Sequence, residues 1–202
     1  MGRGHLPGRD IRIAFGDANI GRCLIVAPHG GGIEPGTSEI MRAVAEAGNW
    51  AWYEFAGFLR KGNHEGLHIA SALFDEPTLL ALLPRTKLVV SVHGSQNEDA
   101  PVVFVGGKWD EGREAMTAAI NGTTDKHGVE AVAAPAHLSG ADPANIANRG
   151  TLGQGIQLEF SRSARNLLFP PDCSREARGR RSASLGALAK AIHGALKKIA
   201  PR

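Results

Sequence analysis

Two histidines and a glutamate stand directly after predicted strands, and together they form a candidate metal site. The apolar run 23–27 leads into His29, three glycines and Glu34, and the apolar run 87–92 leads into His93. The glycines let the backbone turn back sharply, so His29 and Glu34 can face one point. Sites in α/β sheets lie just beyond the strand ends, so the three side chains are expected to converge there. Two histidines and one glutamate form a set that binds catalytic zinc and leaves one position for water.

Two other kinds of hydrolase contain motifs similar to those of this chain. His-Gly-Gly-Gly at 29–32 also occurs in the oxyanion loop of lipases and esterases, but these enzymes need a Gly-x-Ser-x-Gly elbow, which the sequence lacks. Residues 64–68, HEGLH, match the zincin pattern, in which two histidines one helical turn apart bind zinc. Gly62 and Gly66 disfavour the long helix that a zincin needs. A zincin-type peptidase using His64 and His68 stays an alternative, and His68 can instead line the pocket of the first site.

The composition is that of an ordinary globular protein. The 202 residues are 43% hydrophobic and 21% charged, which predicts one domain with a sizeable core. A net charge of +3 suits an anionic ligand but is too small to indicate nucleic acid. Two cysteines form no disulfide framework. The first ten residues lack the apolar stretch of a signal peptide and no segment approaches the length of a membrane span, so no membrane partner and a cytoplasmic location are expected.

Strand and helix patterns alternate along the chain, which predicts an α/β fold. Thr37 or Ser38 is expected to cap the first helix, with Ile40, Met41 and Val44 on its inner face. Strands are expected at residues 23–27, 50–58, 87–92, 101–105, 129–134 and 156–160, and helices at residues 37–47, 77–83, 110–120 and 184–199.

Several motifs, spread in order along the chain, resemble the phage-type poly-gamma-glutamate hydrolases. The resemblance covers roughly residues 22–170. It implies a single zinc-carboxypeptidase-like domain over residues 1–202, with a mixed, mostly parallel sheet flanked by helices. It also implies that His29, Glu34 and His93 bind one zinc ion, and that Glu159 is the general base. The motifs are residues 29–39, 67–69, 91–94, 105–107, 148–150 and 155–162, with the sequences HGGGIEPGTSE, LHI, SVHG, VGG, NRG and GIQLEFSR.

The chemistry of amide hydrolysis asks for the same roles. Zinc lowers the pKa of its bound water to about 7, and a nearby carboxylate can then take the proton. Glu159 and Gln157 share one face of their strand, while Ile156, Leu158 and Phe160 share the other. A charge on such a strand is costly unless it faces a site, so Glu159 is expected at the reacting centre. The alternative is an outward-facing residue of an edge strand.

Polyglutamate carries a free carboxylate on every residue, so an enzyme for it should place arginines near the cleaved bond. Arg149 is the candidate that stabilises negative charge on the attacked carbonyl, and Asn148, Arg149, Arg162 and His68 are the candidates for substrate binding. The sequence therefore predicts a zinc-dependent hydrolase of gamma-glutamyl bonds. The alternative from another class is a non-catalytic module that binds polyanions.

Overall fold

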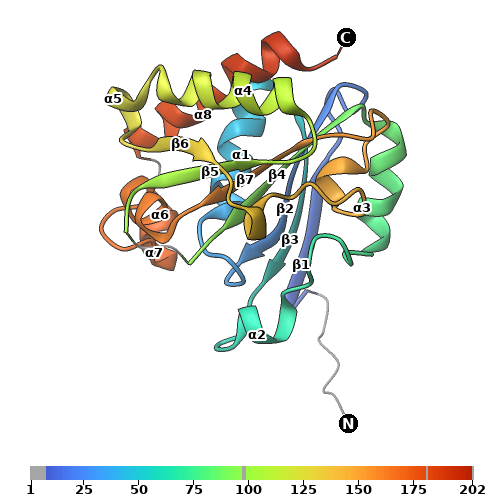
Figure 1. The fold of residues 1–202 in the computed structure, drawn as a ribbon. Helices are drawn as coiled ribbons and strands as arrows, with labels where there is room; N and C mark the ends of the chain where they lie inside the picture. The colour runs from blue at the N-terminus through green and yellow to red at the C-terminus, as the bar shows by residue number, and fades with distance from the viewer. Residues whose placement is uncertain (1–7, 97–98, 181, 202) are drawn as a thin grey trace.

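Seven strands form one mixed sheet in the computed structural model of the chain, which describes residues 8–96, 99–180 and 182–201 (Figure 1). The strands are β1 Ile11–Gly16, β2 Cys23–Gly31, β3 Ala51–Gly57, β4 Leu88–Gly94, β5 Val102–Gly106, β6 Glu130–Ala133 and β7 Ile156–Phe160. Their order is β1-β3-β2-β4-β7-β5-β6, with β1–β3 and β7–β5 antiparallel and the other neighbours parallel. The predicted mixed, mostly parallel sheet is confirmed.

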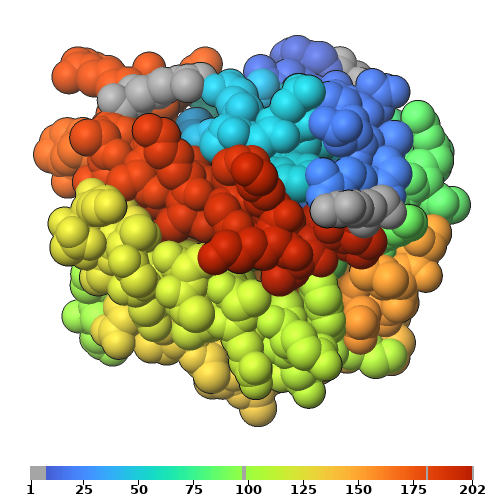
Figure 2. All heavy atoms as spheres, turned by 90° about the horizontal axis from the view of Figure 1, so that it is seen from above, coloured from blue at the N-terminus to red at the C-terminus, as the bar shows by residue number. Residues whose placement is uncertain are grey.

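Helices cover both faces of this sheet, so its central strands are buried on both sides. Alternate residues of β2 show this: Ile25 packs into one hydrophobic cluster, while Leu24 and Val26 pack into the other. Helices α1, α4 and α8 cover one face, with α8 lying between the other two (Figure 2), and α3 lies on the opposite side (Figure 1). The helices are α1 Thr37–Gly48, α2 Asn63–Leu67, α3 Pro77–Leu82, α4 Asp110–Asn121, α5 Thr124–His127, α6 Arg162–Leu168, α7 Arg175–Arg178 and α8 Ala183–Ile199.

The start of α1 differs from the prediction. Its N-cap residue is Gly36, whose φ of 100° is in the left-handed region, and no side chain caps the helix. Thr37 instead donates its hydroxyl to the carbonyls of His29 and Glu34, and the Ser38 hydroxyl accepts from the main-chain N–H of Gly31. The prediction that Thr37 or Ser38 caps the helix was therefore wrong, because both hydroxyls fix the loop that follows β2.

None of the helices in the described ranges combines the length and the apolar character needed to cross a membrane. Residues 1–7, which hold most of the segment used to predict the absence of a signal peptide, lie outside the described residues.

Candidate active site

The ends of three adjacent strands bring the predicted site residues together. Strands β2, β4 and β7 are neighbours in the sheet and run parallel, so their carboxyl ends meet at one edge. His29 lies near the end of β2, and His93 on β4 pairs in register with Glu159 on β7. The pairing of β2 with β3 shifts between Ala27 and Gly30, which marks a bulge at His29. Bulges re-aim side chains next to active sites, and this one accompanies an imidazole that points into the site.

The glycines after His29 turn the chain so that Glu34 comes back to the strand end. The N–H of Glu34 donates to the carbonyl of His29 at 2.9 Å. Gly31 has a φ of 66°, and a Cβ atom there would lie 2.5 Å from the carbonyl oxygen of Gly57. Only glycine fits such a position, so the sharp turn depends on this residue.

Three side chains bring potential ligand atoms within a few ångströms of one another. The Nδ1 atom of His29 lies 2.9 Å from Oε1 of Glu34 and 3.1 Å from Nδ1 of His93. The Nδ1 atom of His93 lies 3.6 Å from Oε2 of Glu34. All three side chains are almost fully buried. The predicted set of two imidazoles and one carboxylate therefore converges in the structure.

Hydrogen bonds on the far side of each ring show which nitrogens face the centre. Nε2 of His29 lies 2.7 Å from the carbonyl of Ile69, which can only accept, so this nitrogen carries the hydrogen and a neutral ring presents a bare Nδ1. Nε2 of His93 faces the hydroxyl of Ser71 at 3.3 Å. Metal-binding histidines are held in this way by an acceptor on the second nitrogen. One nitrogen of each ring and the carboxylate of Glu34 thus face the same point, and a set of two imidazoles and one carboxylate fits a zinc ion.

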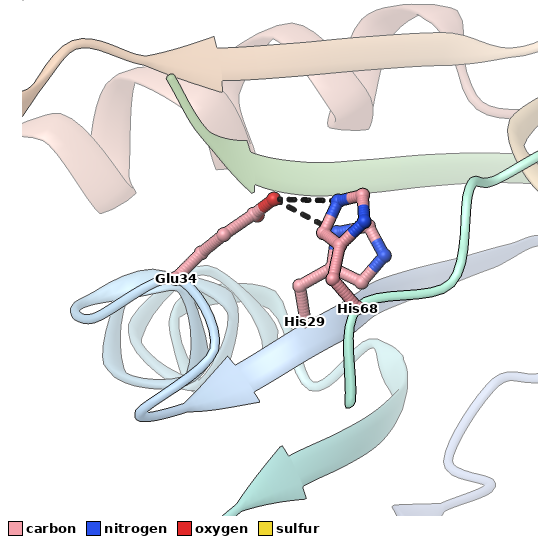
Figure 3. A group of neighbouring side chains, drawn as sticks. All are labelled: His29, Glu34 and His68. Carbon is pink, nitrogen blue, oxygen red and sulfur yellow. Dashed lines mark hydrogen bonds and ion pairs between the residues drawn. The ribbon is translucent and has the colours of Figure 1, made fainter. Parts of the chain in front are cut away.

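His68 approaches the same carboxylate from the mouth of the site. Its Nε2 lies 3.4 Å from Oε1 of Glu34, and its ring centre lies 4.0 Å from that of His29. Figure 3 shows Glu34 pointing from its loop toward both imidazoles. The ligand atoms of His29, Glu34 and His68 all lie within 4.8 Å of one another. The side chain of His68 is 32% exposed, against 3% for His93, so His93 is the better candidate for a buried ligand.

The structure does not provide the helix that a zincin requires. Helix α2 has five residues, and His68 follows it in an extended conformation with a φ of −73° and a ψ of 123°. The rings of His64 and His68 stack, with centres 4.5 Å apart, but Glu65 is exposed and does not line the cavity of the site. The zincin alternative therefore lacks both its regular helix and a base that faces the metal.

Electrostatics distinguish the roles of the buried acids. Burial alone would raise the pKa of Glu34, but the charges and hydrogen bonds of His29, His68 and His93 outweigh it and hold the pKa well below the usual range. Burial raises the pKa of Glu159, only partly opposed by His93. Glu34 therefore stays ionised, as a ligand must, whereas Glu159 is closer to accepting a proton at neutral pH.

A chain of amides orients Glu159. Nε2 of Gln157 donates to Oε1 of Glu159 at 3.0 Å, and Oε1 of Gln157 accepts from Nδ2 of Asn145 at 2.9 Å. Asn145 thereby fixes which end of the Gln157 amide faces the acid. All three side chains line a cavity of about 780 Å³ that also contains His29, Glu34 and His93. The carboxylate that was predicted as the base thus faces the same space as the candidate metal ligands.

The predicted Asn148–Arg149 pair does not line this cavity. Asn148 is buried, and its amide accepts from the N–H groups of Lys108 and Gly155 and donates to two loop carbonyls. Arg149 is exposed and donates to the carbonyl of Phe74. The hydrogen-bonding groups of Asn148 are occupied by the main chain, so the residue holds loops together. Arg162 also lies outside this cavity and lines a neighbouring one.

With this geometry established, comparison with known proteins identifies the family. The model of a family described as poly-gamma-glutamate hydrolase matches residues 3–191. The chain belongs to the poly-gamma-glutamate hydrolase family. The resemblance predicted from the sequence motifs is thus confirmed.

Curated relatives cover the chain to different extents. In Bacillus subtilis (strain 168), the SPbeta prophage-derived UPF0714 protein YoqZ is 38% identical over 148 residues, which are 73% of this chain and 52% of YoqZ. The UPF0714 protein YmaC is 32% identical over 191 residues, which are 94% of this chain and 78% of YmaC. The chain thus spans about half of YoqZ.

Two solved structures share the fold. A bacteriophage poly-gamma-glutamate hydrolase superposes with a TM-score of 0.88 at 33% identity, covering 95% of this chain and 90% of the other. A structure of YndL described as apo and zinc-free gives a TM-score of 0.83 at 29% identity, covering 93% and 90%.

In this member of the poly-gamma-glutamate hydrolase family, sequence reasoning missed Arg165. The residue is buried in α6, directly behind the end of β4, where a Cβ atom on Gly94 would lie 2.8 Å from its guanidinium carbon. It donates to the carbonyls of Pro35, Ser95 and Phe160. Only the helix cap gave a signal: the hydroxyl of Ser161 accepts from the N–H of Ala164, so a helix begins directly after the strand of Glu159.

Proposed function

We propose that the protein is a zinc-dependent hydrolase that cleaves gamma-glutamyl amide bonds in poly-gamma-glutamate or a related anionic peptide. The observation that carries this proposal is the convergence of the Nδ1 atoms of His29 and His93 on the carboxylate of Glu34. Membership of the poly-gamma-glutamate hydrolase family supports the substrate. The zinc-free description of the similar YndL structure supports the metal.

The roles of the residues follow from their positions. One zinc ion held by His29, Glu34 and His93 would act as a Lewis acid that activates water and polarises the cleaved carbonyl. Glu159 takes the proton of the attacking water and then delivers it to the leaving amine. Gln157 holds Oε1 of Glu159, so the acid keeps one orientation during both transfers. Ile69 and Ser71 hold the outer nitrogens of the two histidines.

Substrate binding is proposed to involve His68, whose partly exposed ring stands at the mouth of the cavity. An imidazole there can donate to the substrate carbonyl or carboxylate. Arg162 is proposed to bind a carboxylate of the substrate from the neighbouring cavity. The contributions of Asn148 and Arg149, the count of one zinc ion and the cytoplasmic location stay predictions.

The test measures zinc content and digestion of poly-gamma-glutamate on the same protein samples. Wild type should hold one equivalent of zinc and shorten the polymer, and a chelator should stop the reaction. H29A and H93A should each lose zinc and activity, because each removes one of three ligands. H64A is the matched control, since it removes a histidine near the mouth of the site and should keep the zinc.

Two outcomes would redirect the proposal. A full equivalent of zinc in both H29A and H93A, with loss of zinc in H64A, would favour the zincin alternative. Salt-sensitive binding of poly-gamma-glutamate that a chelator does not change, without any shortening of the polymer, would favour the non-catalytic polyanion-binding module.

A further inference from the structure

A second cavity adjoins the candidate active site and contains the positive charges that the first one lacks. No described arginine or lysine lines the cavity around His29. The neighbouring cavity of about 510 Å³ shares His64 and Gln96 with it, and its lining includes Arg162, Arg165 and Arg178. A polyanionic chain that enters the first cavity therefore meets arginines directly beside it.

Arg165 is the unusual member of this group because its charge is buried without an acidic partner. The residue is 4% exposed, and its hydrogen bonds go to three main-chain carbonyls. It forms no ion pair with any carboxylate in the described part of the chain. Buried charges are normally paired, and arginine stays protonated in proteins. Glu34 and Glu159 act on this charge only through space, so an anionic ligand would supply a directly bonded counter-charge.

The guanidinium has donors left for such a ligand. Nε, Nη1 and Nη2 each donate once, to Phe160, Pro35 and Ser95. Arginine has five N–H donors, so one hydrogen remains on each terminal nitrogen, which is the arrangement that binds a carboxylate through both of its oxygens. Ser95 adds a hydroxyl that is buried and has no partner, and it lines the first cavity.

The other charged residues around this cavity are either ion-paired or exposed to water. Arg178 pairs with Glu39 at 3.1 Å, so its charge is already balanced. Glu65 and Asp172 also line the cavity, but both are exposed, where water screens them. Arg162 is exposed and donates to Gln96, the residue shared by the two cavities. Arg165 is therefore the cation best placed to receive an anion, and Arg162 lines the same cavity close to it.

We propose that Arg162 and Arg165 form a carboxylate-binding subsite, which takes the free alpha-carboxylate of a glutamyl unit next to the cleaved bond. This inference rests on the proposed function. In gamma-linked polyglutamate every unit carries such a carboxylate, whereas an ordinary peptide bond has none at that position. The subsite thus selects gamma-linked glutamyl chains over neutral peptides that the zinc centre alone could attack.

The test compares two polymers that differ only in this carboxylate: poly-gamma-glutamate and the derivative in which its alpha-carboxylates are converted to amides. R162Q and R165K should each lower kcat/KM for poly-gamma-glutamate by about tenfold, because a charge-assisted hydrogen bond is lost or weakened. Both variants should change kcat/KM for the amidated polymer much less. R85Q is the control. Arg85 is a half-exposed arginine that lies just before the start of β4, whereas His93 lies near the end of that strand.

Thermal unfolding shows whether R165K still folds. If R165K does not fold, R162Q alone tests the subsite, because Arg162 is exposed and its replacement leaves the buried side chains in place. Equal losses on both polymers, or no loss on either, would overturn the subsite. A wild type that cleaves neither polymer would instead reject the proposed function. In that case the binding of gamma-linked triglutamate to wild type, R162Q and R165K still tests the subsite: equal affinities would contradict it, and weaker binding by both variants would support it.

Discussion

Glu159 is the residue whose surroundings best explain how the site could carry out hydrolysis. Burial raises its pKa, which brings the acid toward the pH at which it must accept and release a proton. Gln157 donates to Oε1, and no described residue forms a hydrogen bond with Oε2. One oxygen is thus held and the other is available for the proton. We therefore expect Gln157 to be a positioning residue that acts through Glu159.

A double-mutant cycle tests this coupling. E159Q should keep zinc and lose most of its turnover, and Q157L should lower kcat by about tenfold with little change in KM, because the base is misdirected while the substrate-binding residues are unchanged. When Q157L is added to E159Q, it should cost nothing further. N121A is the control, because Asn121 bonds to Ala131 and does not line the cavity. Additive losses in the double variant would show that Gln157 acts independently of Glu159.

The sequence predicted the site residues that follow strands better than those that reach the site from elsewhere. His29, Glu34, His93 and Glu159 meet as expected, because the edge at which parallel strands end is fixed by local patterns. Arg165 could not be predicted in the same way, since its acceptors come from three separate segments.

The pair Asn148–Arg149 does not line the cavity, although its residue types suggested that it would. The motif has the residue types of a carboxylate clamp, but the Asn148 side chain is consumed by main-chain groups that only the folded loop places around it. Residue type and spacing alone cannot distinguish these two uses of an amide.

At the scale of elements, the predicted strands and helices are confirmed with shifts of a few residues, and the missed ones have weak patterns. β1 pairs only with β3 at the edge of the sheet and is largely exposed, so it lacks the apolar run of a central strand. α6 has seven residues, and the charged Arg165 lies on its buried side. A polar residue on the inner face interrupts the spacing of apolar residues from which a helix is predicted.

The side chain of Glu76 caps the N-terminus of helix α3, and its contribution to stability can be tested. Glu76 accepts hydrogen bonds from the N–H groups of Thr78 and Leu79 and from the hydroxyl of Tyr53. Replacement by alanine removes the cap and should lower the free energy of unfolding by about 1–2 kcal/mol. E114A on α4 is the control, because Glu114 is exposed. Chemical denaturation of the three proteins at neutral pH measures the difference.

The sign of the pH effect on this cap follows from its pKa. Burial would raise the pKa of Glu76, but the bonds from Thr78, Leu79 and Tyr53 outweigh it and lower the pKa. A lowered pKa in the folded state means that the ionised acid stabilises the fold at neutral pH, and that this stabilisation is lost as the pH falls below the ordinary glutamate value of about 4.3. The gap between wild type and E76A should therefore narrow in acid. A gap that is constant with pH would assign the effect to packing.

At the scale of the whole molecule, the candidate zinc centre connects parts of the fold that are distant in sequence. His29 and Glu34 come from β2 and the loop that leads into α1, His93 comes from β4, and the acceptors Ile69 and Ser71 come from the segment after α2. The carboxylate and the two imidazoles lie close together and are buried. Zinc bound there should consequently stabilise the entire chain, because local opening at any of these segments would release it.

Removal of zinc should therefore lower the Tm of wild type by roughly 5–10 °C, the shift expected in a domain of this size when free zinc is about one hundred times its Kd. H93A should unfold at the same temperature with and without chelator. Burial would lower the pKa of His93, but Glu159 and Glu34 outweigh it and raise the pKa above its ordinary value. Zinc must displace that proton, so the stabilisation should be largest above this pKa and shrink as the pH falls through it. If the zinc-dependent increase in Tm persists in H93A, or becomes larger in acid, the ion binds the fold through other residues. His68 would then be the first of these to mutate.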